Sequence, residues 1–279
     1  MPVLLPKSLS EATAMLADNS SATLLSGGTD LMVEVNFNHR KPESVIALRH
    51  VPELHNWAIN KEQGTVFIGA SVPYKAMEMG PLAEAVPSLA QAARTVGSPQ
   101  IRAAGSIGGN LGTCSPAGDS LPVLSALDAT VHLVSTNQER TLPFSDFMVG
   151  PKKNARQPDE IITGVTLPIA NGRQGYAKVG VRNAMVISVA SACFALQNNS
   201  ARIALGSVGP VIIRCTEAEK YLNDVLSSGA NVDRDTAEEF GRLVASESRP
   251  IDDHRSTAAY RRHAVGVLAQ RLVLRGQES

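Results

Sequence analysis

The sequence predicts an α+β protein with two domains, and three observations support this fold class. The chain has 279 residues, which is long enough to bury two hydrophobic cores. Helical and strand patterns are mixed up to about residue 168, whereas strand patterns precede helical patterns after residue 175. The intervening stretch "PIANGRQG" is typical of a linker. We therefore expect a first domain over 1–168, with parts at about 1–55 and 56–168, and a second domain over 175–279.

The first part is expected to begin with a helix, a strand and a second helix. Ser8 stands three residues before Glu11, the spacing of a capping box, so a helix begins there. The strand in "SATLLSGGTDL" ends at a Gly-Gly pair, after which Thr29 or Asp30 can cap a helix over "LMVEVNFNH". A further strand is expected in "SVIALRH".

In the remainder of the first domain, the apolar residues show helical periodicity in some segments and strand periodicity in others. "WAINKEQGTVFIGASV" predicts two strands joined around Gly64, and "PLAEAVPSLAQAARTVG" predicts helix. Pro87 must either start a new helix or kink the old one. "SLPVLSALDA" is expected to form a short helix, and strands are expected in "TVHLVST", "ERTLPF" and "EIITGVTLP".

The second domain is expected to contain an antiparallel sheet followed by helices. Strand patterns occur in "YAKVGVRN", "ISVASACFAL" and "ARIALGSVGPVIIR". Helical patterns follow in "TEAEKYLNDVL", "DTAEEFGRLVASE" and "TAAYRRHAVGVLAQRLVLRG". The last of these contains Arg261, Arg262, Arg271 and Arg275, which we interpret either as part of a partner interface or as a solvated basic face.

Composition argues against several classes of function. The 26 Lys and Arg residues balance the 26 Asp and Glu residues, and only 4% of residues are aromatic, so we expect no nucleic-acid partner. The apolar runs are too short to span a bilayer, and the N-terminus lacks an export signal, so we expect a cytoplasmic chain that begins at Met1. Cys114, Cys193 and Cys215 are far apart and show no metal-binding spacing, so we expect reduced thiols and no metal site.

Two glycine-rich stretches carry the functional signal: "SGGTDL" at 26–31 and "QIRAAGSIGGNLGTCSPAGD" at 100–119. A Gly-Gly turn that leads into a helix can present backbone N–H groups to a phosphate. Neither stretch has the spacing of a Walker loop or of a Rossmann dinucleotide turn. The second stretch adds small polar side chains and Asp119, which suits a diphosphate flanked by polyol groups, as in a flavin dinucleotide. The alternative is that the glycines only allow tight turns and close packing.

Three stretches, "LLSGGTDLM", "GSPQIRAAGSIGGNLGTCSPAGDSLPVL" and "YAKVGVRNAMVISVASACFAL", resemble the FAD-binding medium subunit of molybdenum hydroxylases, the xanthine dehydrogenase and carbon monoxide dehydrogenase family. The resemblance covers nearly the whole chain and includes "ARIALGSVGP" and "YRRHAVGVLAQR". It implies a two-part FAD-binding domain of the PCMH type, followed by a C-terminal α+β domain. The loop "GGTDL" resembles the xanthine dehydrogenase branch more than the "GGHSL" of carbon monoxide enzymes.

The resemblance also implies where FAD binds. Backbone amides of the first stretch wrap the diphosphate, and the segment from Ser106 to Asn110 forms the second half of the cradle. Asp119 accepts hydrogen bonds from ribityl or ribose hydroxyls, or instead caps the helix that follows. The implied cofactor-binding residues are Leu24, Leu25, Ser26, Gly27, Gly28, Thr29, Asp30, Leu31, Ser106, Ile107, Gly108, Gly109, Asn110, Thr113, Asp119, Ile162 and Lys178.

Two of these positions, together with Cys114, have particular interpretations. Ile162 would lie by the adenine or the flavin ring system. Lys178 matches a family lysine near the flavin and could stabilise the reduced ring by its charge, unless it is an exposed strand residue. Cys114 lies inside the second stretch, but no basic residue adjoins it, so we expect it to fill a small space rather than to react.

The implied function is electron transfer. In the family, a large molybdopterin-binding subunit hydroxylates the substrate, [2Fe-2S] clusters in a small subunit carry the electrons, and FAD passes them to an acceptor. This chain has too few cysteines for a cluster, so it would be the FAD-binding oxidoreductase subunit, without catalytic side chains of its own. The expected partners are both other subunits, in a dimer of heterotrimers, and NAD is a possible acceptor.

Two alternatives to this function remain open from the sequence. One is a self-sufficient FAD-dependent oxidase or reductase with the same cofactor-binding fold and its own substrate pocket, which would need acid–base residues beside the ring. The other is a non-catalytic interaction subunit whose glycine stretches no longer bind a ligand.

Overall fold

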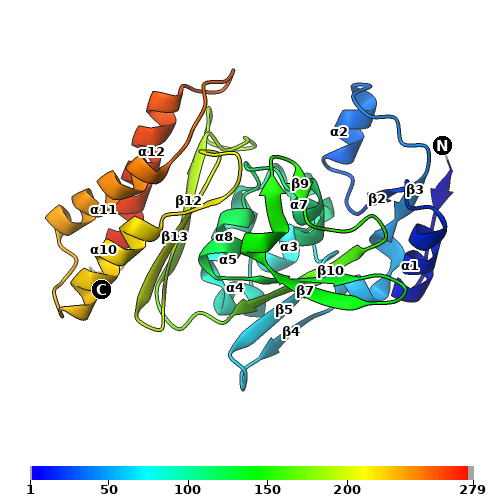
Figure 1. Cartoon of the computed structure of the whole chain (residues 1–279), viewed down its shortest axis with the longest axis horizontal. Helices are drawn as coiled ribbons and strands as arrows, with labels where there is room; N and C mark the ends of the chain where they lie inside the picture. The colour runs from blue at the N-terminus through cyan, green and yellow to red at the C-terminus, as the bar shows by residue number, and fades with distance from the viewer. Residues whose placement is uncertain (1, 276–279) are drawn as a thin grey trace.

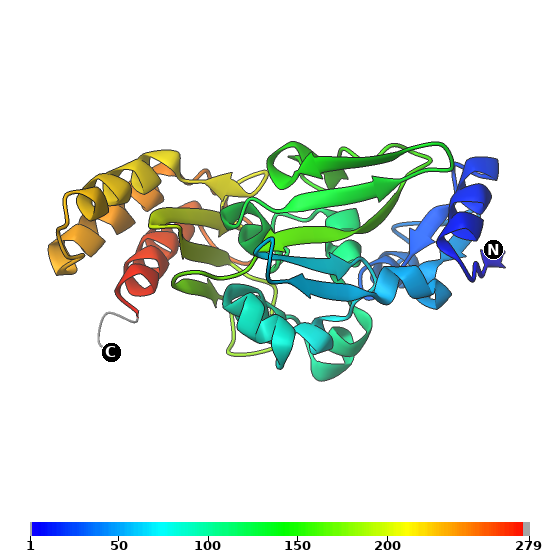
Figure 2. The same cartoon turned by 90° about the horizontal axis from the view of Figure 1, so that it is seen from below.

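In the computed structural model, which describes residues 2–275, the main sheets follow one another along the chain. A three-stranded sheet lies near the N-terminus, a five-stranded sheet in the middle and a four-stranded sheet towards the C-terminus (Figure 1). The strands of the middle sheet lie side by side between the N-terminal and the C-terminal elements (Figure 2). The predicted α+β class, with two-part architecture before a C-terminal antiparallel sheet, is confirmed.

The N-terminal elements form as the local patterns predict. Helix α1 (Leu9–Asp18) is capped by Ser8, whose Oγ accepts a hydrogen bond from the backbone N–H of Glu11 at 3.1 Å. The parallel sheet has the order β1-β3-β2, formed by Val3–Leu4, Val45–Ala47 and Thr23–Leu25. Short 3-10 helices follow β3 at Leu48–His50 and Pro52–His55.

Helix α2 (Leu31–Asn36) follows the first glycine-rich stretch and buries none of its residues. Figure 1 shows it standing away from the three-stranded sheet. Asp30 occupies the N-cap position, as one of the two predicted candidates, but its side chain makes no capping hydrogen bond. The start of this helix therefore keeps unpaired backbone donors.

The five-stranded sheet is antiparallel, with the order β4-β5-β10-β6-β7. Strand β10, the last of these in sequence, is its central strand and holds the two hairpins together. The predicted turn at Gly64 joins β4 and β5. The strands are β4 (Trp57–Asn60), β5 (Thr65–Gly69), β6 (Thr130–Val134), β7 (Glu139–Pro143) and β10 (Ile161–Pro168).

The segment between β5 and β6 forms six helices. Pro87 begins a new helix, which settles the choice that the sequence left open. These helices are α3 (Tyr74–Met77), α4 (Pro81–Ala85), α5 (Pro87–Thr95), α6 (Pro99–Ala104), α7 (Ile107–Thr113) and α8 (Leu121–Ala126). Helix α9 (Phe144–Phe147) and the hairpin of β8 (Met148–Gly150) and β9 (Lys153–Asn154) follow β7.

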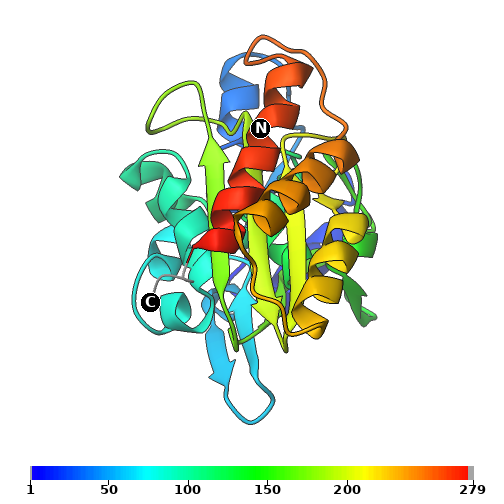
Figure 3. The ribbon, with the colours of Figure 1, turned by 90° about the vertical axis from the view of Figure 1, so that its left-hand side faces the viewer.

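The C-terminal sheet is antiparallel in the order β11-β12-β13-β14, formed by Gln174–Val179, Ala190–Gln197, Ser200–Gly206 and Ile213–Arg214. Helices α10 (Thr216–Ser227), α11 (Arg234–Glu247) and α12 (Ala258–Leu274) cover one face of it (Figure 3). Helices α5 and α8 pack against its other face. Residue 276, the predicted end of the last helix, and the rest of the predicted second domain to 279 lie outside the described residues.

Two hydrophobic clusters form the core. The larger one joins the five-stranded sheet to α5, α7 and α8, and the smaller one lies between the four-stranded sheet and α10 to α12. Cys114, Cys193 and Cys215 are buried free thiols, and burial raises the pKa of Cys114 to about 12, so that its sulfur is not a thiolate at neutral pH. No helix within residues 2–275 is both long and apolar enough to cross a membrane.

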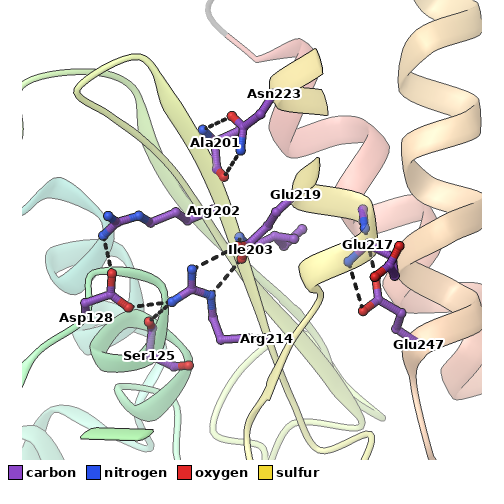
Figure 4. Close-up of polar contacts among 11 residues, drawn as sticks. Ser125, Asp128, Ala201, Arg202, Ile203, Arg214, Glu217, Glu219, Asn223 and Glu247 are labelled. Atoms are coloured by element: carbon purple, nitrogen blue, oxygen red, sulfur yellow. Dashed lines mark hydrogen bonds and ion pairs between the residues drawn. The ribbon is translucent and has the colours of Figure 1, made fainter. Parts of the chain in front are cut away.

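Arg214 on β14 connects the two clusters through charged hydrogen bonds (Figure 4). Its Nη1 donates to the carbonyl oxygen of Ser125 at 2.9 Å and to Asp128 Oδ1 at 2.6 Å, next to α8. Its Nε and Nη2 donate to the two carboxylate oxygens of Glu219 on α10, at 2.7 and 2.9 Å. Burial lowers the pKa of Arg214, but the carboxylates of Glu219 and Asp128 outweigh burial and raise it, so the guanidinium stays charged.

We expect Arg214→Met to lower the free energy of unfolding by about 2–3 kcal/mol, because the buried Glu219 carboxylate loses its bidentate partner. Urea unfolding measures this change. The matched control is Arg242→Met, which removes an exposed pair with Glu239 on one helix and should leave stability unchanged. Equal stability of the two variants would contradict the connecting role of Arg214.

Candidate cofactor site

A cavity of about 780 Å³ lies between the first glycine-rich stretch, helix α7 and the loop that joins β11 to β12. Its volume is within the range of cavities that hold cofactors, roughly 300–1,000 Å³. All but two of the predicted cofactor-binding residues line it. The exceptions are Ile107, which is buried in the core, and Lys178. The residues that do line it are Leu24, Leu25, Ser26, Gly27, Gly28, Thr29, Asp30, Leu31, Ser106, Gly108, Gly109, Asn110, Thr113, Asp119 and Ile162.

The consecutive backbone N–H groups from Gly27 to Leu31 are the main donors at this cavity. Within residues 2–275, none of them has an acceptor in the chain. The first helical bond after the turn runs from the N–H of Met32 to the carbonyl oxygen of Gly28, and Gly28 has a φ of +72°, which favours glycine. Backbone donors in folded proteins are rarely left without a partner. This run of unpaired amides is therefore suited to an anionic ligand.

Close packing holds this turn against the second glycine-rich stretch. A Cβ atom on Gly27 would lie 1.8 Å from the carbonyl oxygen of Ala104, so only glycine fits there. A Cβ atom on Gly108 would lie 2.5 Å from that of Ala70. The hydroxyl oxygens of Ser26 and Ser106 lie 2.9 Å apart and join the two stretches directly. Close packing of elements therefore requires glycine at positions 27 and 108.

The second stretch differs from its sequence prediction. The expected Gly-Gly turn before a helix is wrong, because Gly108 and Gly109 lie inside α7. Ile107 and Leu111, one helical turn apart, are both fully buried and hold this segment in the helical conformation.

Helix α7 consequently leaves few free amides for a ligand. The N–H of Gly108 donates to the carbonyl oxygen of Ala70 at 2.9 Å. The N–H groups of Gly109 and Asn110 donate to Oγ and to the carbonyl oxygen of Ser106, at 3.1 Å each. The contribution of α7 to the cavity is therefore a wall without side chains at Gly108 and Gly109.

Asp119 and Lys178 form a buried ion pair beside the cavity. Lys178 Nζ lies 2.7 Å from Asp119 Oδ2, and both side chains are less than a tenth exposed, at 8% and 9%. The hydroxyl of Tyr176 donates to Asp119 Oδ1 at 2.7 Å. Burial raises the pKa of Asp119, and the ammonium group of Lys178 opposes that shift. The alternatives of a helix cap at Asp119 and an exposed strand residue at Lys178 are wrong.

Lys178 has no donor left for a ligand in this arrangement. Besides Asp119, its Nζ donates to the carbonyl oxygens of Thr95 at 2.9 Å and of Val186 at 3.1 Å. Lys178 therefore connects the strand β11 to α5 and to the loop after β11. Any effect of its charge on a bound ring is reduced by the adjacent carboxylate.

Three cavity-lining cations, Arg40, Lys152 and Arg156, were not predicted from the sequence. Lys152 Nζ lies 2.7 Å from Glu34 Oε1, and Arg40 lies 3.9 Å from the same carboxylate. Arg156 Nη1 donates to nearby backbone carbonyl oxygens, and burial lowers its pKa. No local pattern marks these residues, because the β8–β9 hairpin brings the last two to the cavity.

The donor set fits a flavin dinucleotide. Unpaired amides and the three cations suit a diphosphate, and the cavity also has apolar lining residues at Val96, Ile101 and Ile187 for a planar ring. Ser71 supplies one further polar group: its Oγ is buried at the cavity without a partner in the described part of the chain. Within residues 2–275, no group of His, Cys, Asp or Glu side chains is arranged to hold a metal ion.

Removing the Lys178 charge should strongly destabilise the chain. We expect Lys178→Met to lower the free energy of unfolding by about 3–5 kcal/mol, because it leaves the Asp119 carboxylate buried without its cation. The matched control Lys152→Met acts on a more exposed pair and should cost at most about 1 kcal/mol. Urea unfolding of the FAD-free chain distinguishes them, and similar losses in both variants would contradict the importance of the buried pair.

Comparison with known proteins agrees with this geometry. The family described as "FAD binding domain in molybdopterin dehydrogenase" matches residues 1–170, and "CO dehydrogenase flavoprotein C-terminal domain" matches residues 176–275. The nicotinate dehydrogenase FAD-subunit of Eubacterium barkeri is 35% identical over 231 residues, which cover 78% of this chain and 77% of that protein. The glyceraldehyde dehydrogenase medium chain of Sulfolobus acidocaldarius is 30% identical over 271 residues, covering 95% and 94%.

Solved structures are similar over the whole length. Carbon monoxide dehydrogenase from Hydrogenophaga pseudoflava, solved without the Mo-pyranopterin moiety of its molybdenum cofactor, is 26% identical with a TM-score of 0.89, covering 98% of this chain and 96% of that one. Quinoline 2-oxidoreductase from Pseudomonas putida 86 has the same fold, with 24% identity, a TM-score of 0.91 and coverage of 100% and 97%. The chain therefore belongs to the oxidoreductase family of FAD-binding medium subunits of molybdenum hydroxylases, of the xanthine and carbon monoxide dehydrogenase type.

Proposed function

We propose that this chain transfers electrons within a heteromeric molybdenum hydroxylase of the xanthine dehydrogenase type, from iron-sulfur clusters through FAD to NAD or another acceptor. The observation that carries the proposal is the run of unpaired amides from Gly27 to Leu31 in the wall of a cofactor-sized cavity. Such donors are suited to an anionic partner, and the diphosphate of FAD supplies one.

The residues around the cavity would divide the work of holding FAD. The amides from Gly27 to Leu31 would donate to diphosphate oxygens, while Arg40, Lys152 and Arg156 add positive charge nearby. Gly109 leaves room because it presents no side chain. The polar groups of Asn110, Thr113 and Asp119 would orient the sugar hydroxyls, and Ile162 and Ile187 would contact a ring.

Bound FAD would supply the redox chemistry, because it can accept electrons one at a time and release them as a pair. The chain itself would supply position and electrostatics. Its thiols are buried and unpaired, so the described residues offer no cysteine set for a cluster. The electrons would therefore arrive from a small [2Fe-2S] subunit, beside a large molybdopterin-binding subunit, in a proposed dimer of heterotrimers.

Relatives support an assembly of this kind through their names. They include a carbon monoxide dehydrogenase medium chain and a nicotine 6-hydroxylase medium subunit.

We also propose that the domains extend over 1–168 and 175–279. The free thiols favour a reducing compartment such as the cytoplasm.

Gly109→Leu should separate cofactor binding from folding. A Cβ atom at Gly109 would meet only Ser106 Oγ at 3.4 Å and Ser26 Cβ at 4.0 Å, so the FAD-free fold tolerates it. Leucine also favours a helix more than glycine does, by roughly 0.5–1 kcal/mol, so the FAD-free chain should melt at the same or a higher temperature. The larger side chain fills cavity space, and we expect FAD affinity to fall by at least about tenfold.

Titration of the full-length chain with FAD, followed by flavin absorbance and fluorescence, measures the FAD affinity of the unaltered chain and of each variant. Gly109→Ala is the matched control and should keep most of the affinity. If the unaltered chain binds no FAD, a non-catalytic interaction subunit is favoured. If Gly109→Leu binds FAD as well as the unaltered chain does, the proposed site is wrong. If an organic substrate bleaches the flavin of the isolated, FAD-loaded chain, the self-sufficient oxidase or reductase is favoured instead.

A further inference from the structure

Arg261 on α12 is a buried cation that the proposed function does not use. Its side chain is only 5% exposed, so the sequence reading of a solvated basic face is wrong at this position. Nη1 donates to the carbonyl oxygens of Val189 at 2.8 Å and of Ser207 at 2.7 Å. Nη2 lies 2.6 Å from Asp253 Oδ1, whereas Nε has no partner within the described chain.

The carbonyl of Val189 belongs to a loop that reaches the cavity. This loop joins β11 to β12, and its residues Met185, Val186 and Ile187 line the cavity wall. At the base of the loop, the N–H of Val189 donates to the carbonyl oxygen of Val179 at 2.7 Å. Arg261 therefore fixes the end of a segment whose middle part contacts the cofactor space.

The carbonyl of Ser207 belongs to a second segment that reaches the same wall. The N–H of Ser207 donates to the carbonyl oxygen of Pro116 at 2.8 Å, and its hydroxyl lies 2.8 Å from that of Ser188. The hydroxyl of Ser188 donates to the carbonyl oxygen of Ala117 at 3.3 Å, and Ala117 lines the cavity. By binding both carbonyls, Arg261 joins the loop after β11 to the segment that contains Ser207. Ser207 in turn contacts the end of the second glycine-rich stretch.

Asp253 keeps the guanidinium in place. Its Oδ1 also accepts hydrogen bonds from the backbone N–H groups of Arg255 at 2.8 Å and Ser256 at 3.2 Å. Burial raises the pKa of Asp253, but these amides and Arg261 outweigh burial and lower it to about 2. Lysine could not reproduce this arrangement, because the planar fork of arginine directs donors to two carbonyls and a carboxylate at once.

We propose that Arg261 is a positioning residue for the cofactor site, which fixes the wall formed by residues 185–188 and 115–117 against the flavin ring. This inference rests on the proposed function. Met185 and Ile187 are apolar cavity residues that are more than half exposed, so the position of their loop sets how far a bound ring is open to solvent and to an electron acceptor. Arg261 acts on the ring only through this loop.

The test compares Arg261→Lys with the matched control Arg262→Lys at the adjacent, exposed arginine. In the FAD-free full-length chain, we expect exchange of the amides of Val189 and Ser207, which donate to the carbonyl oxygens of Val179 and Pro116, to become at least about tenfold faster in Arg261→Lys, the effect of losing one charged hydrogen bond. In the FAD-loaded chain, iodide should quench flavin fluorescence with a constant at least about twofold higher, because the ring is less covered. Arg262→Lys should change neither.

Asp253→Asn provides a second variant if Arg261→Lys folds poorly, and it should change both readouts in the same direction by less. Exchange that rises evenly along the whole chain, or that stays unchanged at Val189 and Ser207, would show a merely structural role and overturn the proposal. Failure of the unaltered chain to bind FAD would overturn the proposed function. The exchange measurement on the FAD-free chain would still decide whether Arg261 holds the cavity wall.

Discussion

The close approach of two backbone segments is the constraint on which the site depends. Gly27 packs against the carbonyl oxygen of Ala104, and the hydroxyls of Ser26 and Ser106 meet across the junction. A chain that bends so sharply after β2 cannot pair the amides from Gly27 to Leu31 with its own carbonyls. Unpaired amides are costly unless water or a ligand accepts their hydrogen bonds. The packing thus leaves these amide donors available to an acceptor from outside the chain.

The C-terminal sheet completes the site from the other side. The Asp119–Lys178 pair crosses from the end of the second glycine-rich stretch to β11, and both charges are buried where they meet. Arg214 makes further charged contacts between the C-terminal elements and the earlier part of the chain, at Ser125 and Asp128. A cofactor wall that includes Met185 to Ile187 therefore requires the C-terminal elements to be docked. The binding of FAD and the packing of the C-terminal elements against the earlier part of the chain should therefore be energetically linked.

Much of the fold could be predicted from short-range signals, and the exceptions have physical reasons. Ser8, Pro87 and Gly64 mark the ends of elements by local backbone chemistry, and the structure follows them. The prediction from local signals was wrong at α7, where burial of Ile107 and Leu111 outweighs the low helix propensity of the glycines. The resemblance supplied 15 of the 37 lining residues of the cavity. Lys152 and Arg156 were missed because only long-range packing of the β8–β9 hairpin brings them there.

Amide hydrogen exchange of the full-length chain, with and without FAD, tests the central claim most directly. We expect FAD to slow exchange of the amides from Gly27 to Leu31 by at least about tenfold, because each gains a phosphate acceptor that the chain does not supply. The amides of Gly108 and Asn110, which already have acceptors, should change much less. Bound flavin with unchanged exchange from Gly27 to Leu31 would contradict the account.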